Sequence, residues 1–168
     1  MDIRDARPDD AAGIARIYND AVRNTTAILM DSEVDAANRV AWMAARVALG
    51  YPVLVAVEDG QVMGYASFGD FRPFDGFRAS VEHSVYVAEA ARGQGLAFRL
   101  LSALIPRARA CGKHLMIAGI TSENVASLRL HEKAGFVESA RMHEVGQKFG
   151  RWLDLVFMQL RLDQRPQP

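Results

Sequence analysis

The chain has one cysteine among its 168 residues, and this Cys111 alone cannot form an intramolecular disulfide or a cysteine-based zinc site. No stretch comes close to about 18 uninterrupted apolar residues, and the N-terminus lacks the apolar core of a signal peptide. Lysine plus arginine equal aspartate plus glutamate at 20 each, so no overall field would attract nucleic acid or an anionic membrane. We therefore expect a cytoplasmic protein with no metal site, no nucleic-acid partner and no membrane partner.

Two common nucleotide-binding motifs are also missing. A Walker A loop requires glycine, four residues and then Gly-Lys-Ser/Thr, and no such run occurs. A Rossmann fingerprint requires G-x-G-x-x-G with an acidic residue about 20 positions later. Gly93 and Gly95 are followed by Phe98 rather than by a glycine, and residues 111–115 contain no carboxylate. A nucleoside triphosphatase and a dinucleotide-dependent enzyme are therefore disfavoured.

The length and an apolar content of 50% suit one domain with a sizeable core. We expect that domain over residues 1–163 and a flexible polar tail over residues 164–168. Apolar periodicity, caps and turn residues predict a mixed order of strands and helices. The expected strands cover residues 3–7, 52–58, 61–68, 82–87, 114–121, 137–145 and 152–162. Four helices are expected: one begins after Asp9 or Asp10, one begins after Asp35, and two cover residues 95–110 and 124–133.

Two details of this pattern concern individual residues. Asp59-Gly60 separates two apolar runs and predicts a tight hairpin turn with positive φ angles. Trp152 lies in an apolar run of the last strand, and by default an aromatic side chain there belongs to the core.

The most informative segment is Arg92-Gly93-Gln94-Gly95-Leu96-Ala97, where a strand ends in a glycine-containing turn and a long helical pattern begins. Glycines let the backbone approach a ligand closely, and the N-terminus of the following helix presents free N–H groups and its positive dipole end. The guanidinium of Arg92 adds a full charge beside them. The turn suits an anionic phosphate, although glycine turns before helices also occur as ordinary loops.

A second pattern runs from Asn124 to Phe136 as N-x-x-S-x-x-x-H-x-x-x-G-F. In local terms Asn124 caps a short helix and Gly135 ends it. Together with the R-x-x-G-x-A turn, this pattern resembles the cofactor motifs of the GNAT superfamily of N-acetyltransferases. The resemblance implies an α/β (α+β) GNAT fold, whose mixed, mostly antiparallel central sheet is flanked by helices on both faces. It also implies acetyl-CoA (coenzyme A) as the cofactor.

By the same resemblance, the backbone of the strand before the turn would pair with the pantetheine arm, and the turn would hold the pyrophosphate. The side chains of Asn124 and Ser127 would contact the pantetheine or the nucleotide end. The cofactor-binding residues implied in this way are Val85, Tyr86, Val87, Arg92, Gly93, Gln94, Gly95, Leu96, Ala97, Phe98, Asn124 and Ser127.

Within this superfamily the chain resembles the phosphinothricin acetyltransferase branch, and in it the bacterial methionine sulfoximine or methionine sulfone acetyltransferases. Residues 64–68, 72–78, 81–87 and 148–154 carry the likeness. It implies a homodimer, because the region of Trp152 lies near a dimer contact in that branch. An arginine in the acceptor pocket could take an amino acid carboxylate in two parallel hydrogen bonds. The acceptor pocket implied by the likeness consists of Arg72, Pro73, Phe74, Glu82, His83 and Ser84.

Acetyl transfer to an amine requires a base, because free amino acids are mostly ammonium ions at neutral pH. Glu82, on the strand that leads into the cofactor site, is the candidate base, acting directly or through water. His131 stands where many GNAT enzymes carry a tyrosine that is commonly proposed to protonate the coenzyme A thiolate. It is the second candidate catalytic residue, and the identity of the general acid stays open. His83 neighbours Glu82, but its side chain should point to the opposite face of the sheet.

The sequence thus predicts an acetyl-CoA-dependent N-acetyltransferase for the α-amine of a small amino acid analogue. Methionine sulfoximine, methionine sulfone and phosphinothricin are the implied substrates, and acetylating them would be a detoxification. Two alternatives stay open, namely an acetyltransferase for protein N-termini, lysine or polyamines, and a non-catalytic acyl-CoA-binding module. Arginines near the acceptor site favour a carboxylate over a polyamine, and Glu82 and His131 argue against a non-catalytic module.

Overall fold

The computed structural model describes residues 1–168 and contains one seven-stranded sheet with the strand order β1-β2-β3-β4-β5-β7-β6. The strands are β1 Asp2–Asp5, β2 Val53–Glu58, β3 Gln61–Asp70, β4 Ser80–Val87, β5 Leu115–Thr121, β6 Val137–Lys148 and β7 Arg151–Arg161. The helices are α1 Ala11–Asn24, α2 Ala36–Ala48, α3 Leu96–Ala110 and α4 Val125–Lys133, with short 3-10 turns at Pro8–Asp10, Asp75–Phe77 and Glu89–Ala91. Each expected strand and helix is present, and the ends that the sequence predicted by number differ by at most three residues.

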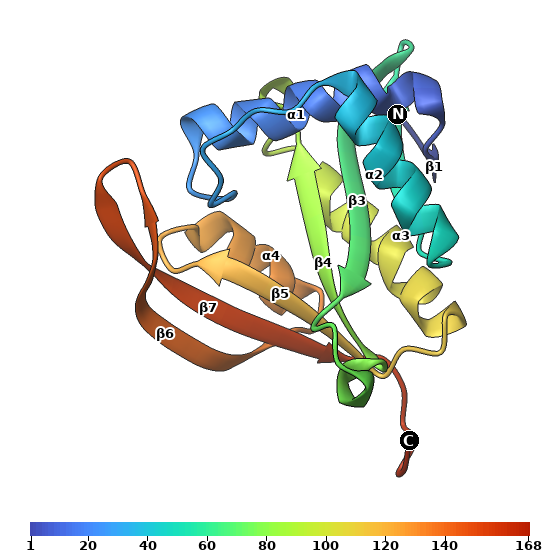
Figure 1. The fold of residues 1–168 in the computed structure, drawn as a ribbon, viewed down its shortest axis with the longest axis vertical. Helices are drawn as coiled ribbons and strands as arrows, with labels where there is room; N and C mark the ends of the chain where they lie inside the picture. The colour runs from blue at the N-terminus through green and yellow to red at the C-terminus, as the bar shows by residue number, and fades with distance from the viewer.

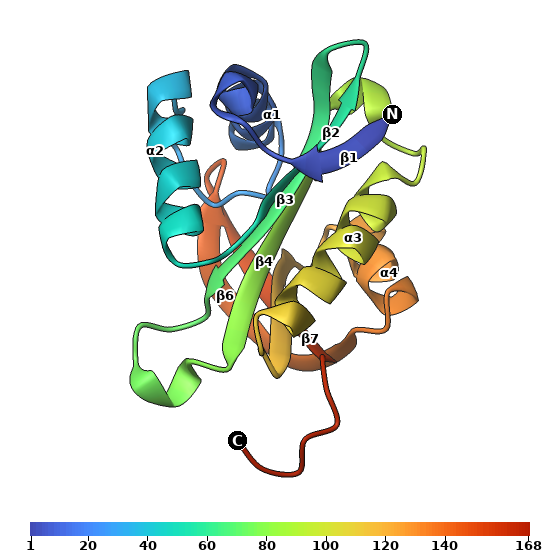
Figure 2. The same cartoon turned by 90° about the vertical axis from the view of Figure 1, so that its right-hand side faces the viewer.

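Helices cover both faces of the sheet. Figure 2 shows α1 and α2 on one side of β3 and β4 and α3 and α4 on the other. Every neighbouring strand pair is antiparallel except β4 and β5, which run parallel. The expected mixed, mostly antiparallel sheet flanked on both faces is therefore confirmed. None of the helices combines the length and the apolar character that a membrane span requires.

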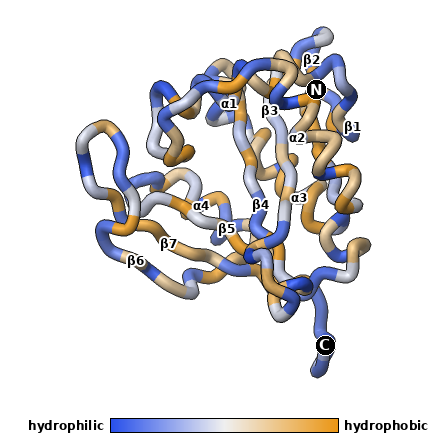
Figure 3. The backbone as a smooth tube through the Cα atoms, in the orientation of Figure 1, coloured by the Kyte–Doolittle hydropathy of each residue, from blue (hydrophilic) through white to orange (hydrophobic).

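The two faces of the sheet carry separate cores. The larger one packs α3 against the central strands, with Leu100, Leu101 and Leu104 of the helix fully buried. The smaller one packs α1 and α2 against the other face, through residues such as Ile14 and Tyr65. Alternation along each strand therefore sends successive side chains to different helices. The tail after β7 is hydrophilic (Figure 3).

The hairpin between β2 and β3 has the backbone that its sequence requires. Asp59 and Gly60 both have positive φ angles, 49° and 76°, as the two central positions of a type I′ turn demand. Likewise Asp35 caps α2, because its side chain accepts a hydrogen bond of 2.7 Å from the backbone N–H of Asn38. These local signals fix the start of α2 and the register of the central hairpin.

The prediction for Trp152 is wrong, because its side chain is 66% exposed. It pairs with Gln147 near the tip of the β6–β7 hairpin, at the outer edge of the sheet (Figure 1). An apolar run indicates a strand, but it does not indicate which residues of an outer hairpin lie under a helix. Trp152 therefore belongs to an exposed apolar surface.

The feature of the fold that creates the site is the divergence of β4 and β5. The two strands pair only where Ser80, Val81 and Glu82 lie opposite Leu115, Met116 and Ile117. Beyond this point they separate, and Figure 1 shows β5 turning away from β4 toward α4. The end of β4 that leads into the glycine turn therefore has a free edge.

Candidate active site

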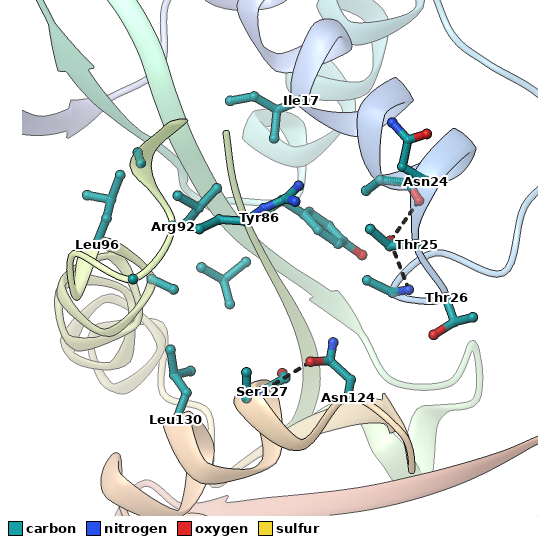
Figure 4. Close-up of a pocket in the computed structure, with 18 of the residues that line it drawn as sticks. Ile17, Asn24, Thr25, Thr26, Tyr86, Arg92, Leu96, Asn124, Ser127 and Leu130 are labelled. Carbon is teal, nitrogen blue, oxygen red and sulfur yellow. Dashed lines mark hydrogen bonds between the residues drawn. The ribbon is translucent and has the colours of Figure 1, made fainter. Parts of the chain in front are cut away.

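A cavity of about 850 Å³ opens at the free edge of β4 (Figure 4). Its walls come from α1 and the loop after it, from β4, from the turn before α3, from α4 and from the tip of the β6–β7 hairpin. The residues that line it include Ile17, Ala21, Asn24, Thr25, Thr26, Ala27, Val85, Tyr86, Val87, Arg92, Gly93, Gly95, Leu96, Ala97, Asn124 and Ser127. The structure thus brings together all the predicted cofactor-binding residues except the side chains of Gln94 and Phe98.

The turn before α3 presents a set of free backbone donors. None of the backbone N–H groups of residues 93–98 donates a hydrogen bond within the chain. Gly93 and Gly95 have φ angles of 75° and 74°, and a Cβ added at either would meet no atom within 4 Å. Such donors at a helix N-terminus attract an anion, because the helix dipole adds positive potential at the same place. This cradle fits a diphosphate.

Two side chains of the turn point away from the cavity, and a third, Arg92, is engaged at its wall. The Gln94 amide donates a 3.0 Å hydrogen bond to the carbonyl of Ala90, and the Phe98 ring lies 4.6 Å from the Lys133 ammonium. Arg92 forms an ion pair of 2.6 Å with Asp20 of α1. Gln94 and Phe98 therefore contribute backbone to the cradle, and the charge of Arg92 is shared with α1.

The free edge of β4 supplies a second set of backbone groups. The N–H of Ala88 donates to the carbonyl of Met63 on β3, at 2.8 Å. Because successive residues of a strand direct their N–H and C=O groups to alternate sides, Val85 and Val87 direct theirs away from β3 toward the open side. An amide-containing ligand arm lying there would pair with β4 as an additional strand does.

Asn124 serves the helix and the cavity together. Its Oδ1 accepts a 3.1 Å hydrogen bond from the backbone N–H of Ser127, which caps α4. Its Nδ2 group has no partner in the chain and faces the cavity with the Ser127 side chain (Figure 4). The capping and ligand-binding interpretations of Asn124 are therefore compatible.

Sequence reasoning missed the wall formed by α1 and residues 24–27. Lys148 holds this wall in place, since its buried ammonium donates to the carbonyls of Thr25 and Ile28 at 2.8 and 2.5 Å. Thr26 also donates to Glu123 at 2.9 Å, next to α4. Lys148 belongs to a segment that carries the family likeness, but nothing in its local sequence indicates this role. A lysine in a chain segment between two strands looks like an ordinary exposed charge until the fold brings the carbonyls to it.

Glu82 lies on the face of the sheet that α1 and α2 cover. Its side chain lies on the same face of β4 as that of Tyr86, four residues later, and the Tyr86 ring packs against Tyr65 of the smaller core. The carboxylate has no hydrogen-bond partner, and a Cβ at Gly119 of β5 would come within 2.9 Å of its Oε1. Burial raises the pKa of Glu82, while the positive charge of Arg72 opposes part of that rise. A half-buried carboxylate without a partner is well suited to accept a proton.

His83 lies on the opposite face of the sheet from Glu82, as the alternation along the strand predicts. Its buried ring lies on the opposite face, against Phe136 and against His131 of α4. The two Nε2 atoms of His83 and His131 are 3.1 Å apart. Burial lowers the pKa of His83 to about 3, so this ring is neutral. This placement agrees with the expectation that His83 points away from the face that carries Glu82. His83 instead borders a small pocket together with Ser84 and His131.

The geometry also argues against His131 as a proton donor. Its Nδ1 lies 2.7 Å from the carbonyl of Ser127, so this nitrogen must carry a hydrogen and donate it there. Burial lowers the pKa of His131, so its Nε2 holds a lone pair and accepts the hydrogen of His83 Nε2. Both ring nitrogens are thus engaged within the chain, and the buried side chain borders only a small pocket of about 70 Å³ beside the cavity. The hydrogen bond between His83 and His131 instead connects α4 to β4.

The remaining acceptor candidates lie at the far end of β4 and in the loop that precedes it. Arg72, Pro73 and Phe74 are exposed, and the Arg72 guanidinium lies 5.3 Å from the ring centre of Phe71. Phe71 packs edge-on against Phe157 of β7. The loop thus lies close to the strands that border Glu82, and Ser84 is exposed on the same face as Glu82. No group of three or more histidine, cysteine, aspartate or glutamate side chains is placed to hold a metal ion.

Comparison with known proteins agrees with this geometry. Residues 14–136 match the model of the acetyltransferase (GNAT) family. The chain is 62% identical to the L-amino acid N-acyltransferase MnaT of Escherichia coli, covering 100% of this chain and 98% of that protein. It is 60% identical to a Salmonella typhimurium L-methionine sulfoximine/L-methionine sulfone acetyltransferase, again over 100% and 98%. More distant relatives are named phosphinothricin N-acetyltransferase.

Among solved structures, the acetyltransferase YncA of Salmonella typhimurium, with its cofactor acetyl-CoA, superposes with a TM-score of 0.98. It is 60% identical in sequence, and the match covers 99% of this chain and 96% of that one. The glycine cradle, the free edge of β4 and the diverging strands are thus those of an acetyltransferase fold. The chain belongs to the GNAT family of acetyltransferases.

Proposed function

We propose that this protein transfers the acetyl group of acetyl-CoA to the α-amine of a small amino acid analogue, with methionine sulfoximine, methionine sulfone and phosphinothricin as candidate substrates. The observation that carries the proposal is the run of unpaired N–H groups over residues 93–98, beside the free edge of the strand that bears Glu82. The names of the relatives and the acetyl-CoA in a structure 60% identical to this chain support it.

Each part of the cavity has a task in this reaction. The amides of residues 93–98 bind the diphosphate, and Val85 and Val87 orient the pantetheine amides. Acetyl-CoA supplies an acyl group already activated as a thioester. Glu82 accepts the proton of the substrate amine, directly or through water, so that the nitrogen lone pair is free to attack. His131 holds α4, and with it Asn124 and Ser127, at the correct distance from β4.

The substrate class is tested by measuring acetyl-CoA turnover with methionine sulfone, methionine sulfoximine, phosphinothricin, a panel of protein amino acids, spermidine and short peptides. We expect the amino acid analogues to have the highest kcat/KM, because Arg72 lies close enough to Glu82 to influence its pKa and an arginine favours a carboxylate-bearing acceptor. A preference for spermidine or peptides would overturn the assignment. Calorimetric binding of coenzyme A without turnover of any amine would instead indicate a non-catalytic binding module.

The same substrates define the proposed biological role. Acetylation of the amine removes the positive charge of these analogues, and losing that charge would detoxify them. We also propose that the protein acts in the cytoplasm, where acetyl-CoA is available to a bacterial enzyme. The names of the bacterial relatives support the substrate class on which this role depends.

We propose further that two copies associate through the β6–β7 hairpin. Its exposed apolar side chains are Val137, Met142, Val145, Phe149 and Trp152. Several exposed apolar side chains on one outer hairpin favour an interface, because a contact with a second copy would remove them from water. Sedimentation is expected to show a dimer that Trp152→Glu converts to a monomer, whereas a monomeric parent protein would refute the proposal.

A further inference from the structure

Arg46 of α2 differs from the other arginines of the chain. Three arginines are half-buried, namely Arg4, Arg39 and Arg46. Arg4 donates to Asp10 and Arg39 to Asn38, whereas the side chain of Arg46 makes no hydrogen bond or ion pair, and its Nε is fully buried without a partner. Leaving a partly desolvated cation without an acceptor costs free energy unless a ligand supplies one.

The guanidinium of Arg46 has a defined position. It covers the Cα of Gly69 on β3, so closely that a Cβ at Gly69 would overlap its Nη1 and Cζ atoms. Its Cζ lies 5.8 Å from the ring centre of Trp42, one turn earlier on α2. Figure 2 shows α2 running alongside β3 on the side of the sheet that α1 also covers. A helix, a glycine and an aromatic ring therefore hold the fork in place before any substrate binds.

Glu82 lies directly beside this position. In the antiparallel pairing of β3 and β4, Gly69 is the partner of Glu82, and side chains of such pairs stand about 5 Å apart on the same face. The Glu82 carboxylate extends the other way, toward Gly119 of β5. The Arg46 guanidinium and the backbone of Glu82 thus lie side by side on one face of the sheet, while the Glu82 carboxylate extends away from Arg46 and does not pair with it. A zwitterionic amino acid carries the complementary charges, a carboxylate for Arg46 and an ammonium group for Glu82.

We propose that Arg46 binds the α-carboxylate of the acceptor and so restricts the enzyme to α-amino acids, an inference that rests on the proposed function. The ammonium group is then placed at Glu82, and the planar fork of Arg46 takes both carboxylate oxygens. The positive charge of Arg72, on the exposed loop, adds to the attraction for that carboxylate. Asp70 is the acidic residue whose charge acts most strongly on Arg46, but it forms no ion pair with it and accepts the Tyr51 hydroxyl instead.

The test compares methionine sulfone with its decarboxylated analogue, 3-(methylsulfonyl)propylamine. We expect the parent enzyme to prefer the amino acid by about 100-fold in kcat/KM, as charge-assisted bidentate pairs are strong. Arg46→Gln is expected to abolish most of that preference by raising KM for methionine sulfone, while the amine is turned over as before. Arg39→Gln, two turns earlier on the same helix, is the matched control and keeps the preference.

A second variant leaves the arginine in place. Gly69→Ala adds one methyl group that displaces only the flexible end of Arg46, so it should fold and lose the same preference. Equal losses of kcat/KM for both substrates in Arg46→Gln and Gly69→Ala would mean that Arg46 only offsets the negative charge of Asp70, and this result would overturn the proposal. An unchanged preference for methionine sulfone in both variants would also overturn it. A parent enzyme inactive on all amino acids would show that the proposed function itself is wrong.

Discussion

Replacing Glu82 by glutamine is expected to lower kcat/KM for the amino acid acceptor by about 10²–10⁴-fold, the usual contribution of a positioned general base. Glutamine keeps the shape of the side chain but cannot accept the amine proton. Calorimetry should show unchanged coenzyme A affinity, because the cradle at residues 93–98 lies beyond the other end of β4. Unchanged turnover in Glu82→Gln would remove this residue from the mechanism.

The pH dependence of the reaction carries a further expectation for Glu82. A base must be deprotonated, and burial raises the pKa of this carboxyl above its ordinary value of 4.5. The acidic limb of kcat should therefore have its midpoint above 4.5 and should disappear in Glu82→Gln. A limb that persists in the variant would belong to another group.

The stability of the fold should change with pH in the opposite sense to kcat, because the protonated form of Glu82 is the one that the folded state favours. Because the pKa of Glu82 is higher in the folded than in the unfolded chain, the folded state binds this proton more tightly. The resulting stabilisation is present below the unfolded pKa and is lost as the pH rises through the folded pKa. At neutral pH the charged carboxylate therefore destabilises the fold, and Glu82→Gln should raise Tm there and have little effect below about pH 4. An inactive variant with a raised Tm cannot be explained by misfolding.

His131→Gln is the matched comparison, since it removes the second candidate from the opposite face of the sheet. Both ring nitrogens of His131 are engaged by Ser127 and His83. The variant should therefore lose thermal stability, while kcat falls much less than in Glu82→Gln. A fall in kcat as large as that of Glu82→Gln would restore His131 as the proton donor.

Much of this fold could be predicted because its local signals agree with one another. Asp59-Gly60 requires a hairpin, Asp35 starts a helix, and the apolar stripe at Leu100, Leu101 and Leu104 requires cover by a sheet. The cofactor turn could also be predicted, because the positive φ angles of Gly93 and Gly95 leave few other residues possible there. These are properties of short segments, and a sequence displays them directly.

The parts that escaped prediction depend on contacts between distant segments. Lys148 holds the α1 wall through the carbonyls of Thr25 and Ile28, more than a hundred residues away. The engagement of His131 by His83 depends on how closely α4 approaches β4. Periodicity indicates which residues share a face, but it does not indicate what packs on that face. For that reason Arg46 looked like any helix-surface charge until α2 was placed over Gly69.

The second large effect is expected from a charge placed in the glycine cradle. Gly95→Asp should weaken coenzyme A binding by about 100-fold, because like charges about 4 Å apart repel by about 1 kcal/mol in water and about 4 kcal/mol near a protein surface. Aspartate tolerates the left-handed backbone that Gly95 adopts, and Asp59 of this chain already has a φ of 49°. A Cβ at Gly95 meets no other atom, so the variant should fold.

Gly95→Asn is the control, because asparagine has the same shape and the same tolerance of a positive φ but no charge. Both variants bear any backbone strain and any steric loss equally, so the difference between their coenzyme A dissociation constants isolates the repulsion of the diphosphate. That difference should shrink as the salt concentration rises, since exposed charges are screened over about 10 Å at 0.1 M ionic strength. If Asp and Asn bind coenzyme A equally, the unpaired amides of residues 93–98 do not hold an anion, and the cofactor site lies elsewhere.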